Sequence, residues 1–282
     1  MAARPAVGRA REEKDQRLLV AQITDFHIST PEGEPERRFG TSGFLRRAVA
    51  HLNALTPAPA AVLATGDLVH EGSAEEYALL EALLAPLAMP VYLIPGNHDA
   101  REPLRAAFLD DGYLPVEGFL NYTVEDLPLR LVALDTHQPG EVGGLLCEER
   151  LTWLSARLAE QSERPTLIFM HHPPFATGIK RMDLWGLENA GALGAVIARH
   201  GQVERIVCGH LHRPISTRWH GTVVSTCPST AHQFALDVSG DPDRLDVIME
   251  PPACQLHLWR PEAGLVTHTS YIGDYGEPRP AS

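Results

Sequence analysis

The sequence predicts an α/β layered fold, on three observations. Short aliphatic or β-branched runs alternate with amphipathic stretches from Leu18 to Gly209. The runs are mostly unbroken by polar residues, as expected of strands that are covered on both faces. The stretches between them repeat apolar residues at helical spacing, which is typical of helices packed on a sheet. Strands and helices that alternate in this way form parallel sheets, which bind ligands near the carboxyl ends of their strands.

The expected elements follow in chain order. The expected strands are Leu18–Ile23, Ala61–Ala64, Val91–Ile94, Arg130–Leu134, Thr166–Met170 and Arg205–Cys208, and the expected helices are Phe44–Leu55, Ser73–Leu87, Glu148–Glu160 and Glu188–His200. Ser73 and Glu76 at the start of one helix have the spacing of a capping box. After Gly209 the helical period fades, and strands are expected at Gly221–Thr226, Leu256–Trp259 and Gly264–Tyr271.

Composition excludes several classes of partner. The chain has 282 residues and a formal net charge of -12, whereas a protein that binds a long nucleic acid normally carries a basic face. No apolar run approaches the roughly 20 residues that a membrane span needs, so no membrane partner is expected. Four scattered cysteines without a CxxC pair favour a reducing compartment.

The chain divides into three expected parts. Residues 1–17 mix basic and acidic side chains without the apolar stretch of a secretory signal, which indicates a disordered arm on a cytoplasmic protein. Residues 18–272 form the main domain. Residues 273–282, which end in Gly-Glu-Pro-Arg-Pro-Ala-Ser, are expected to be a loose tail.

Polar side chains follow most of the predicted strands, at the point where each strand ends. These residues are Asp25 and His27, Asp67, Asn97 with His98 and Asp99, His171, and His210 with His212. Glycine stands beside them three times, as expected where the backbone approaches an ion or ligand closely. Each motif alone is usually a solvated loop. Because the carboxyl ends of parallel strands converge on one crevice, the succession favours a metal site.

The donor types narrow the choice of metal. Imidazole nitrogen with carboxylate and amide oxygen, without thiolate, suits Mn, Fe, Zn or Co better than Ca or Mg. Seven side chains are too many for one tetrahedral ion. If Asp67 bridges, they divide into two sites with four protein ligands each. Two ions roughly 3.5–4 Å apart are the usual clamp for attack on phosphorus.

The motifs also carry a family resemblance. Asp25-x-His27, Gly66-Asp67, Gly96-Asn97-His98-Asp99, His171 and Gly209-His210-x-His212 resemble the motif set of the calcineurin-like metallophosphoesterases, over about residues 20–213. This resemblance implies a four-layer α/β/β/α sandwich. Further stretches are similar to the bacterial group of glycerophosphodiesterase and class III cyclic nucleotide phosphodiesterases, namely Tyr92–Asp99, Phe169–Pro174, Met182-Asp183 with Glu188-Asn189, and Ser225-Thr-x-Pro with Ala231-His-Gln233.

The resemblance assigns a role to each site residue. It implies one metal held by Asp25, His27, Asp67 and His212, and a second held by Asp67, Asn97, His171 and His210. His98 is expected to face the phosphate, with Asp99 orienting its ring and a metal-bound hydroxide as the nucleophile. The implied activity is hydrolysis of small, glycerophosphodiester-like phosphodiesters. A 3',5'-cyclic nucleotide phosphodiesterase is the alternative, followed by a phosphomonoesterase and a catalytically inactive scaffold.

The remaining polar residues carry weaker expectations. His232 matches a substrate-pocket position of the subfamily, with a core or surface histidine as the equal alternative. Phe39 stands where the resembled glycerophosphodiesterase has a tyrosine. His172 and Arg213 adjoin ligands and are expected to support them. Asp135 and His137, after the fourth predicted strand, could line the rim of the site, but a solvated turn is the preferred interpretation. The histidines that belong to no motif are taken as structural: His51, His70, His200, His220, His257 and His268.

Two segments are candidate cap or oligomer-interface elements, residues 178–190 and 227–260. The first contains Met182, Leu184, Trp185 and Leu187, which would form an apolar interface patch if they were exposed. The alternative is a lid packed on its own domain. The resemblance favours a homo-oligomer, a dimer or higher.

Overall fold

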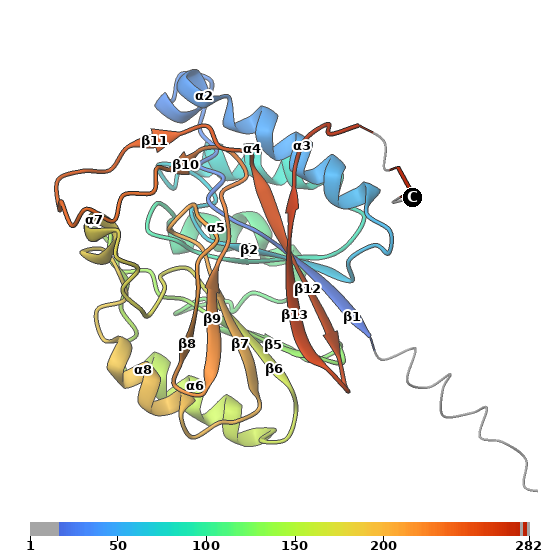
Figure 1. The fold of residues 1–282 in the computed structure, drawn as a ribbon, viewed down its shortest axis with the longest axis vertical. Helices are drawn as coiled ribbons and strands as arrows, with labels where there is room; N and C mark the ends of the chain where they lie inside the picture. The colour runs from blue at the N-terminus through green and yellow to red at the C-terminus, as the bar shows by residue number, and fades with distance from the viewer. Residues whose placement is uncertain (1–16, 277–278, 281–282) are drawn as a thin grey trace, which may run out of the picture.

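Two β-sheets face each other in the computed structural model, which describes residues 17–276 and 279–280. Figure 1 shows α3 and α4 above the strands and α6 and α8 below them. Each sheet is therefore covered by helices on its outer face, and the expected α/β/β/α sandwich is confirmed. The two sheets share one hydrophobic core in which most strand residues are fully buried.

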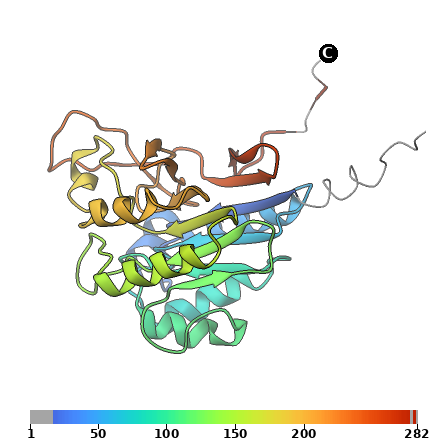
Figure 2. The ribbon, with the colours of Figure 1, turned by 90° about the horizontal axis from the view of Figure 1, so that it is seen from below.

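The first sheet has the strand order β13-β12-β1-β2-β3. β1 (Leu18–Ile23), β2 (Ala61–Thr65) and β3 (Val91–Ile94) run parallel. β12 (Ala253–Arg260) pairs antiparallel with β1, and β13 (Gly264–Tyr271) pairs antiparallel with β12. Figure 2 shows these last two strands, in red, beside the blue β1. The helices that connect the parallel strands are α3 (Thr41–Ala54) and α4 (Ala74–Leu84).

The second sheet has the order β4-β5-β6-β7-β9-β8. Its strands are β4 (Tyr122–Val124), β5 (Arg130–Leu134), β6 (Thr166–Met170), β7 (Val203–Cys208), β8 (Ser216–Trp219) and β9 (Thr222–Thr226). β5, β6, β7 and β9 run parallel, and the two edge strands are antiparallel to their neighbours. The helices α6 (Glu148–Glu160) and α8 (Ala190–Ile197) make the connections that bring successive strands into parallel register.

Several short elements lie outside the predicted set. They are α2 (Glu34–Phe39), α5 (Arg101–Phe108), a 3-10 turn η1 (Leu109–Asp111), α7 (Lys180–Asp183), β4, β8, and the two-stranded ribbon of β10 (Gln233–Phe234) and β11 (Val247–Ile248). The predicted capping box is present at α4: Glu76 N donates to Ser73 Oγ at 3.3 Å, and Ser73 N donates to a Glu76 carboxylate oxygen at 3.2 Å. It satisfies two backbone donors of the first turn.

A buried polar side chain joins the two sheets. Gln22 Nε2 donates to Thr65 Oγ1 and to the Cys208 carbonyl, both at 2.9 Å, so it connects the carboxyl ends of β1, β2 and β7. Its Oε1 lies 3.2 Å from His257 Nε2, which keeps the amide in one orientation. His257 is fully buried and has this structural role, as expected. The strand ends that carry the site residues are thereby held in register across the sandwich.

The predicted division of the chain stays a prediction. The arm expected over residues 1–17 lies outside the described residues except for Arg17, and the expected tail is described only in part. Among the described residues, none of the helices combines the length and the apolar character that crossing a bilayer requires.

Candidate metal centre

The loops that follow the strands have an unusual backbone. Non-glycine residues with φ between 47° and 71° include Asp25, His27, Asp67, His210 and His212. This left-handed conformation is uncommon for residues with a Cβ and costs on the order of 1–3 kcal/mol where the structure enforces it. All five residues are buried members of the predicted site. Backbone strain is thus concentrated where the sequence predicts the chemistry.

Three glycines make the close approach of these loops possible. A Cβ at Gly96 would overlap the Asp67 carboxylate, and a Cβ at Gly66 would overlap the His171 ring. A Cβ at Gly209 would overlap the Thr24 hydroxyl and the backbone beside it. The glycines predicted from sequence to permit close approach therefore lie at points where only hydrogen fits.

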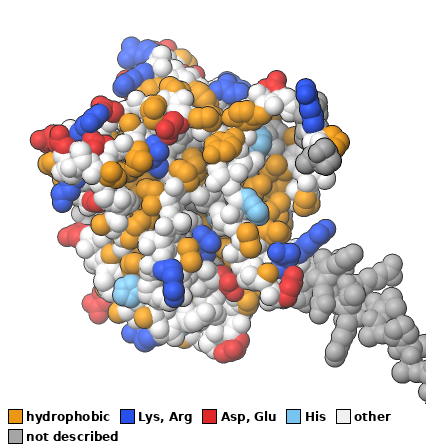
Figure 3. Space-filling view, viewed as in Figure 1, with side chains coloured by type: hydrophobic (Ala, Val, Ile, Leu, Met, Phe, Trp, Pro, Cys, Tyr) orange, Lys and Arg blue, Asp and Glu red, His pale blue; other side chains and the backbone are white. Residues whose placement is uncertain are grey.

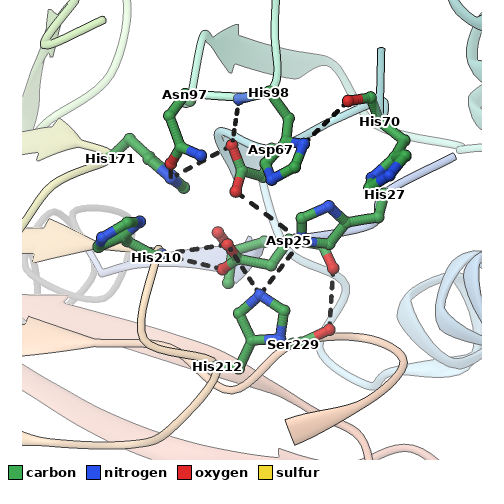
Figure 4. Close-up of polar contacts among 12 residues, drawn as sticks. Asp25, His27, Asp67, His70, Asn97, His98, His171, His210, His212 and Ser229 are labelled. Atoms are coloured by element: carbon green, nitrogen blue, oxygen red, sulfur yellow. Dashed lines mark hydrogen bonds and ion pairs between the residues drawn. The ribbon is translucent and has the colours of Figure 1, made fainter. Parts of the chain in front are cut away.

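One group of donor atoms forms around Asp25 and two histidines. His212 Nε2 lies 3.4 Å from Asp25 Oδ1 and 3.2 Å from His27 Nε2. His27 Nε2 in turn lies 3.8 Å from Asp67 Oδ2. Candidate ligand atoms of Asp25, His27 and Asp67 all lie within 4.8 Å of one another. Four side chains from three separate loops therefore converge on one point (Figure 4).

A second group lies on the other side of Asp67. His171 Nε2 is 3.4 Å from Asp67 Oδ1 and 3.2 Å from Asn97 Oδ1. His210 joins this group through its ring, whose centroid is 5.1 Å from that of His171. The two oxygen atoms of Asp67 therefore face different groups, one towards His27 and one towards His171.

Hydrogen bonds from the backbone set the orientation of the imidazoles. His171 Nδ1 is bonded to the Thr65 carbonyl at 2.8 Å, and His212 Nδ1 to the His232 carbonyl at 2.9 Å. Because a carbonyl only accepts, Nδ1 carries the hydrogen in each ring and Nε2 is left as a lone-pair donor. The lone pairs of both rings therefore face the carboxylates of the site.

Burial shifts the protonation of the cluster. It lowers the pKa of His27, and burial together with the neighbouring His171 lowers the pKa of His210 to about 3. Burial would also lower the pKa of His171, but the Asp67 carboxylate and further contacts raise it to about 9. Burial would raise the pKa of Asp67, but His171, His98 and His27 hold it well below its usual value. His27 and His210 are therefore neutral imidazoles, whereas His171 pairs as an imidazolium with the ionised Asp67 carboxylate, and its proton is one that a cation bound there would displace.

His98 lies beside this cluster on a more open part of the surface. Its backbone N–H donates to Asp67 Oδ1 at 3.0 Å, and its ring packs edge-on against His27 with centroids 4.8 Å apart. Burial opposes its protonation, but Asp67 and the hydrogen bond to a backbone carbonyl raise its pKa above the ordinary value. The ring is thus placed to offer a proton next to the donor groups.

The expectation that Asp99 orients the His98 ring is wrong. His98 Nδ1 donates instead to the His70 carbonyl, at 2.8 Å. The hydrogen bonds found for the Asp99 carboxylate among the described residues come from Tyr77 Oη, at 2.8 Å, and from backbone N–H groups, including Gly96 N at 2.7 Å. Burial and the Asp67 charge raise the pKa of Asp99 to about 6. Asp99 therefore shapes the loop rather than the ring.

The expectation of a solvated turn at Asp135 and His137 needs correction. Asp135 and His137 are buried rather than solvated, because Asp135 binds Arg101 through both carboxylate oxygens, at 2.5 and 2.9 Å. In the segment 178–190, Met182 and Leu187 are buried against their own domain, and of its large apolar residues only Leu184 is exposed, at 56%. Whether this segment is a lid or part of an interface stays a prediction.

Two histidines near the centre have roles of their own. Both ring nitrogens of His172 are engaged, with Thr136 Oγ1 at 2.8 Å and the Val142 carbonyl at 3.0 Å, so it supports the site without a free donor atom. His70, taken as structural in the sequence, stacks on His98 with centroids 4.8 Å apart and an interplanar angle of 19°. No sequence signal marks His70, because its position depends on the fold of the Asp67 loop.

An aromatic wall lies next to the first donor group. His232 stacks on Phe39 with centroids 4.3 Å apart, and its ring lies 5.6 Å from that of His27. The Arg38 guanidinium lies over Phe39, 4.8 Å from the ring centre. His232 was expected on the substrate side, and Phe39 replaces the tyrosine of the resembled glycerophosphodiesterase. The two side chains therefore belong to the same surface.

Comparisons with known proteins agree with this arrangement. The profile of the calcineurin-like phosphoesterase family matches residues 18–214. The chain is 38% identical over 264 residues to a probable glycerophosphodiester phosphodiesterase GpdQ of Arcobacter nitrofigilis, covering 93% of this chain and 96% of that protein. It is 30% identical over 220 residues to the 3',5'-cyclic adenosine monophosphate phosphodiesterase CpdA of Escherichia coli K12, covering 78% of each.

A solved structure shares the fold at low sequence identity. A dimetal phosphatase from Danio rerio superposes with a TM-score of 0.62 and 17% identity, over 91% of this chain and 99% of the other. The family match and the phosphodiesterase relatives make this chain a phosphoric diester hydrolase. The chain belongs to the calcineurin-like phosphoesterase family.

Proposed function

We propose that the protein hydrolyses small, glycerophosphodiester-like phosphodiesters with two bound metal ions. The observation that carries the proposal is the position of Asp67, whose two oxygens face His27 and His171 in separate donor groups. A shared carboxylate between two groups is the arrangement expected of a dinuclear phosphoesterase site.

The donor atoms fit cations. His210 Nε2 is buried and has no hydrogen-bond partner among the described residues. His27 Nε2 and His212 Nε2 lie 3.2 Å apart, so both ring nitrogens face the point between their loops where a cation would bind. Asp25, His27, Asp67 and His212 would hold one ion, and Asp67, Asn97, His171 and His210 the other. Nitrogen and oxygen donors together favour Fe, Mn, Zn or Co.

The chain's own residues supply the rest of the mechanism. When bound, the ions provide Lewis acidity at the phosphoryl group and make water a nucleophile near neutral pH. His98 presents Nε2 to the phosphate, because its Nδ1–H is donated to the His70 carbonyl. It stabilises the phosphoryl charge or donates a proton to the leaving oxygen. Asp99 holds the Asp67 and Asn97 loops together through Leu68 N and Gly96 N.

The substrate class rests on the relatives and on the aromatic wall. The similarity to the GpdQ relative covers 93% of this chain, which includes the segments that carry Phe39 and His232. We propose that this surface and Arg38 contact the leaving group of the diester. A 3',5'-cyclic nucleotide phosphodiesterase is the second candidate, favoured by the similarity to proteins of that name. The net charge of -12 argues against a long nucleic acid substrate.

A substrate panel tests the proposal. We expect kcat/KM for glycerophosphoethanolamine to exceed the values for cyclic AMP and for a phosphomonoester, at identical loading with Mn, Fe, Zn or Co. If kcat/KM for cyclic AMP were at least about tenfold above the other two values, which corresponds to about 1.4 kcal/mol in transition-state stabilisation, the protein would be a cyclic nucleotide phosphodiesterase. A preference for the monoester would make the protein a phosphomonoesterase, and no metal-dependent turnover would make it a scaffold.

We also propose a homo-oligomer, a dimer or higher, formed through residues 227–260. Leu236, Val238 and Met249 in or beside the β10–β11 ribbon are 63%, 66% and 53% exposed. Figure 3 shows apolar side chains on this face of the molecule, with acidic and basic side chains among them. Exposed apolar groups on a short ribbon are typical of an interface. Light scattering at micromolar concentration is expected to give at least twice the 30.9 kDa chain mass; a particle of 30.9 kDa would contradict this proposal.

The compartment that we propose is the cytoplasm. All four cysteines are described by the structure, and all four are free thiols. Three of them, Cys208, Cys227 and Cys254, are buried, where burial raises the pKa of each thiol and keeps it unreactive. Thiol titration of the freshly purified protein is expected to find four reactive groups after unfolding.

A further inference from the structure

His70 lies on the loop that follows β2, three residues after Asp67. Its backbone N–H donates to the Ile28 carbonyl at 3.0 Å, and the preceding Leu68 and Val69 N–H groups donate to Asp99 at 3.1 and 3.4 Å. These bonds connect residues 68–70 to the loop after β1 through Ile28 and to the loop after β3 through Asp99. The backbone position of His70 is therefore fixed by the same loops that carry the metal-site residues.

His70 contacts His98 in two ways. Its carbonyl accepts the hydrogen of His98 Nδ1 at 2.8 Å, which leaves Nε2 of His98 turned away from residue 70. Its ring stacks on the His98 ring at 4.8 Å between centroids, with 19° between planes. The hydrogen bond sets which edge of His98 points to the site, and the stack resists tilting of the ring plane (Figure 4).

The His70 ring is held mainly by packing. It is 26% exposed and meets the His27 ring edge-on at 5.8 Å. Its Nδ1 is buried and has no hydrogen-bond partner among the described residues, while Nε2 lies 3.6 Å from the exposed Glu71 carboxylate. The ring's aromatic face, not its nitrogens, makes the close contact with the site.

We propose that His70 is a positioning residue for the reaction, whose ring holds the His98 imidazole in the plane that presents Nε2 to the phosphate. The proposal rests on the proposed function, in which His98 acts on the phosphate or the leaving oxygen. Residues that act through a catalytic group by orienting it commonly change rates by 10- to 100-fold, less than the roughly 10²- to 10⁴-fold of the acid itself.

Three substitutions separate the ring from its nitrogens. Every variant keeps the backbone carbonyl, so the bond to His98 Nδ1 is retained in all of them. His70→Phe keeps an aromatic face without nitrogen, His70→Asn keeps polar atoms without a ring, and His70→Ala keeps neither. His268→Ala, at an exposed position of the edge strand β13, is the matched control for loss of an imidazole.

The measured quantity is the dependence of kcat on the leaving group, at equal metal content. With glycerophosphoethanolamine, a poor leaving group, we expect His70→Ala and His70→Asn to lower kcat by about 10- to 100-fold and His70→Phe by less than about threefold. With a p-nitrophenyl diester, which needs little protonation, the losses shrink to a few-fold. Equal losses on both substrates would indicate a merely structural role, and recovery by Asn but not by Phe would indicate a hydrogen-bonding role; either result overturns the proposal.

A double-mutant cycle separates this proposal from the proposed function. If His70 acts through His98, the His70→Ala change has no further effect on kcat in a His98→Ala background. Additive losses would overturn the positioning role while leaving the role of His98 intact. A His98→Ala protein with unchanged kcat on the poor leaving group would instead refute the function proposed for His98, and the positioning role with it.

Discussion

The shared carboxylate is tested most directly by Asp67→Asn. The side chain keeps its shape, and its amide oxygen still accepts the hydrogen bond from His98 N, which is 3.0 Å long in the native protein. What is lost is the charge that faces His27 Nε2 at 3.8 Å and His171 Nε2 at 3.4 Å. Because these histidines belong to different donor groups, one substitution weakens both ions.

The size of the effect follows from that position. Removing a group that only supports a ligand typically lowers metal affinity by 10- to 100-fold, so loss of a direct charged ligand should lower it by at least about 100-fold per ion. This corresponds to about 2.8 kcal/mol at each site, since each factor of ten is 1.4 kcal/mol. Competition with a chelator, followed by elemental analysis, measures both affinities.

The control is Asp110→Asn, which changes an exposed carboxylate in the 3-10 turn η1. It should keep the metal content and turnover of the native protein, while Asp67→Asn keeps native circular dichroism and loses both. If Asp67→Asn bound two ions per chain with native affinity, Asp67 would not be a shared ligand and the dinuclear assignment would be refuted.

Three further changes test other parts of the site. His98→Ala should retain its metal but lower kcat by about 10²- to 10⁴-fold on poor leaving groups, and unchanged kcat there would exclude an acid role. Tyr77→Phe removes a buried hydroxyl that donates to Asp99 at 2.8 Å and accepts from Ala100 N at 3.0 Å. Denaturant titration should show a free energy of unfolding lower by about 1–3 kcal/mol. An unchanged free energy of unfolding would mean that Asp99 forms a hydrogen bond with another group. Gly96→Ala places a Cβ against the Asp67 carboxylate, so metal content should fall, and native metal binding would show that the loop can move aside.

Much of the fold was predictable because the strands have simple chemistry. β1, β3, β5 and β6 have the predicted bounds, because aliphatic and β-branched residues dominate each run, with Gln22 and Arg130 as buried polar exceptions. Helix α5 was not predicted because it is short and its eight residues, REPLRAAF, are largely polar. Packing against α4 stabilises its helical form. Short edge strands such as β4 were missed because pairing with β5, not propensity, makes them strands.

Some positions near the candidate metal centre could likewise be predicted from the sequence, and some contacts there could not. The positions of Asp67 and His171 could be predicted because both lie within two residues of the end of a buried strand, and parallel strand ends converge. The support of His98 by His70 could not be predicted, because it depends on a backbone carbonyl whose direction is set by hydrogen bonds to Ile28 and Asp99. Likewise, the burial of Asp135 depends on Arg101, which is 34 residues away in the chain.

The sequence by itself determined the donor types, their succession after strands and the glycines that let them approach, because these are properties of residue type and periodicity. Tertiary structure alone decided that the strand ends belong to two facing sheets, which side of Asp67 each histidine occupies, and which neighbour holds the His98 ring. The physical reason is that hydrogen bonds, stacking and burial act between atoms brought together by the fold. Their geometry follows from packing across the sandwich, and no local pattern in the chain records it.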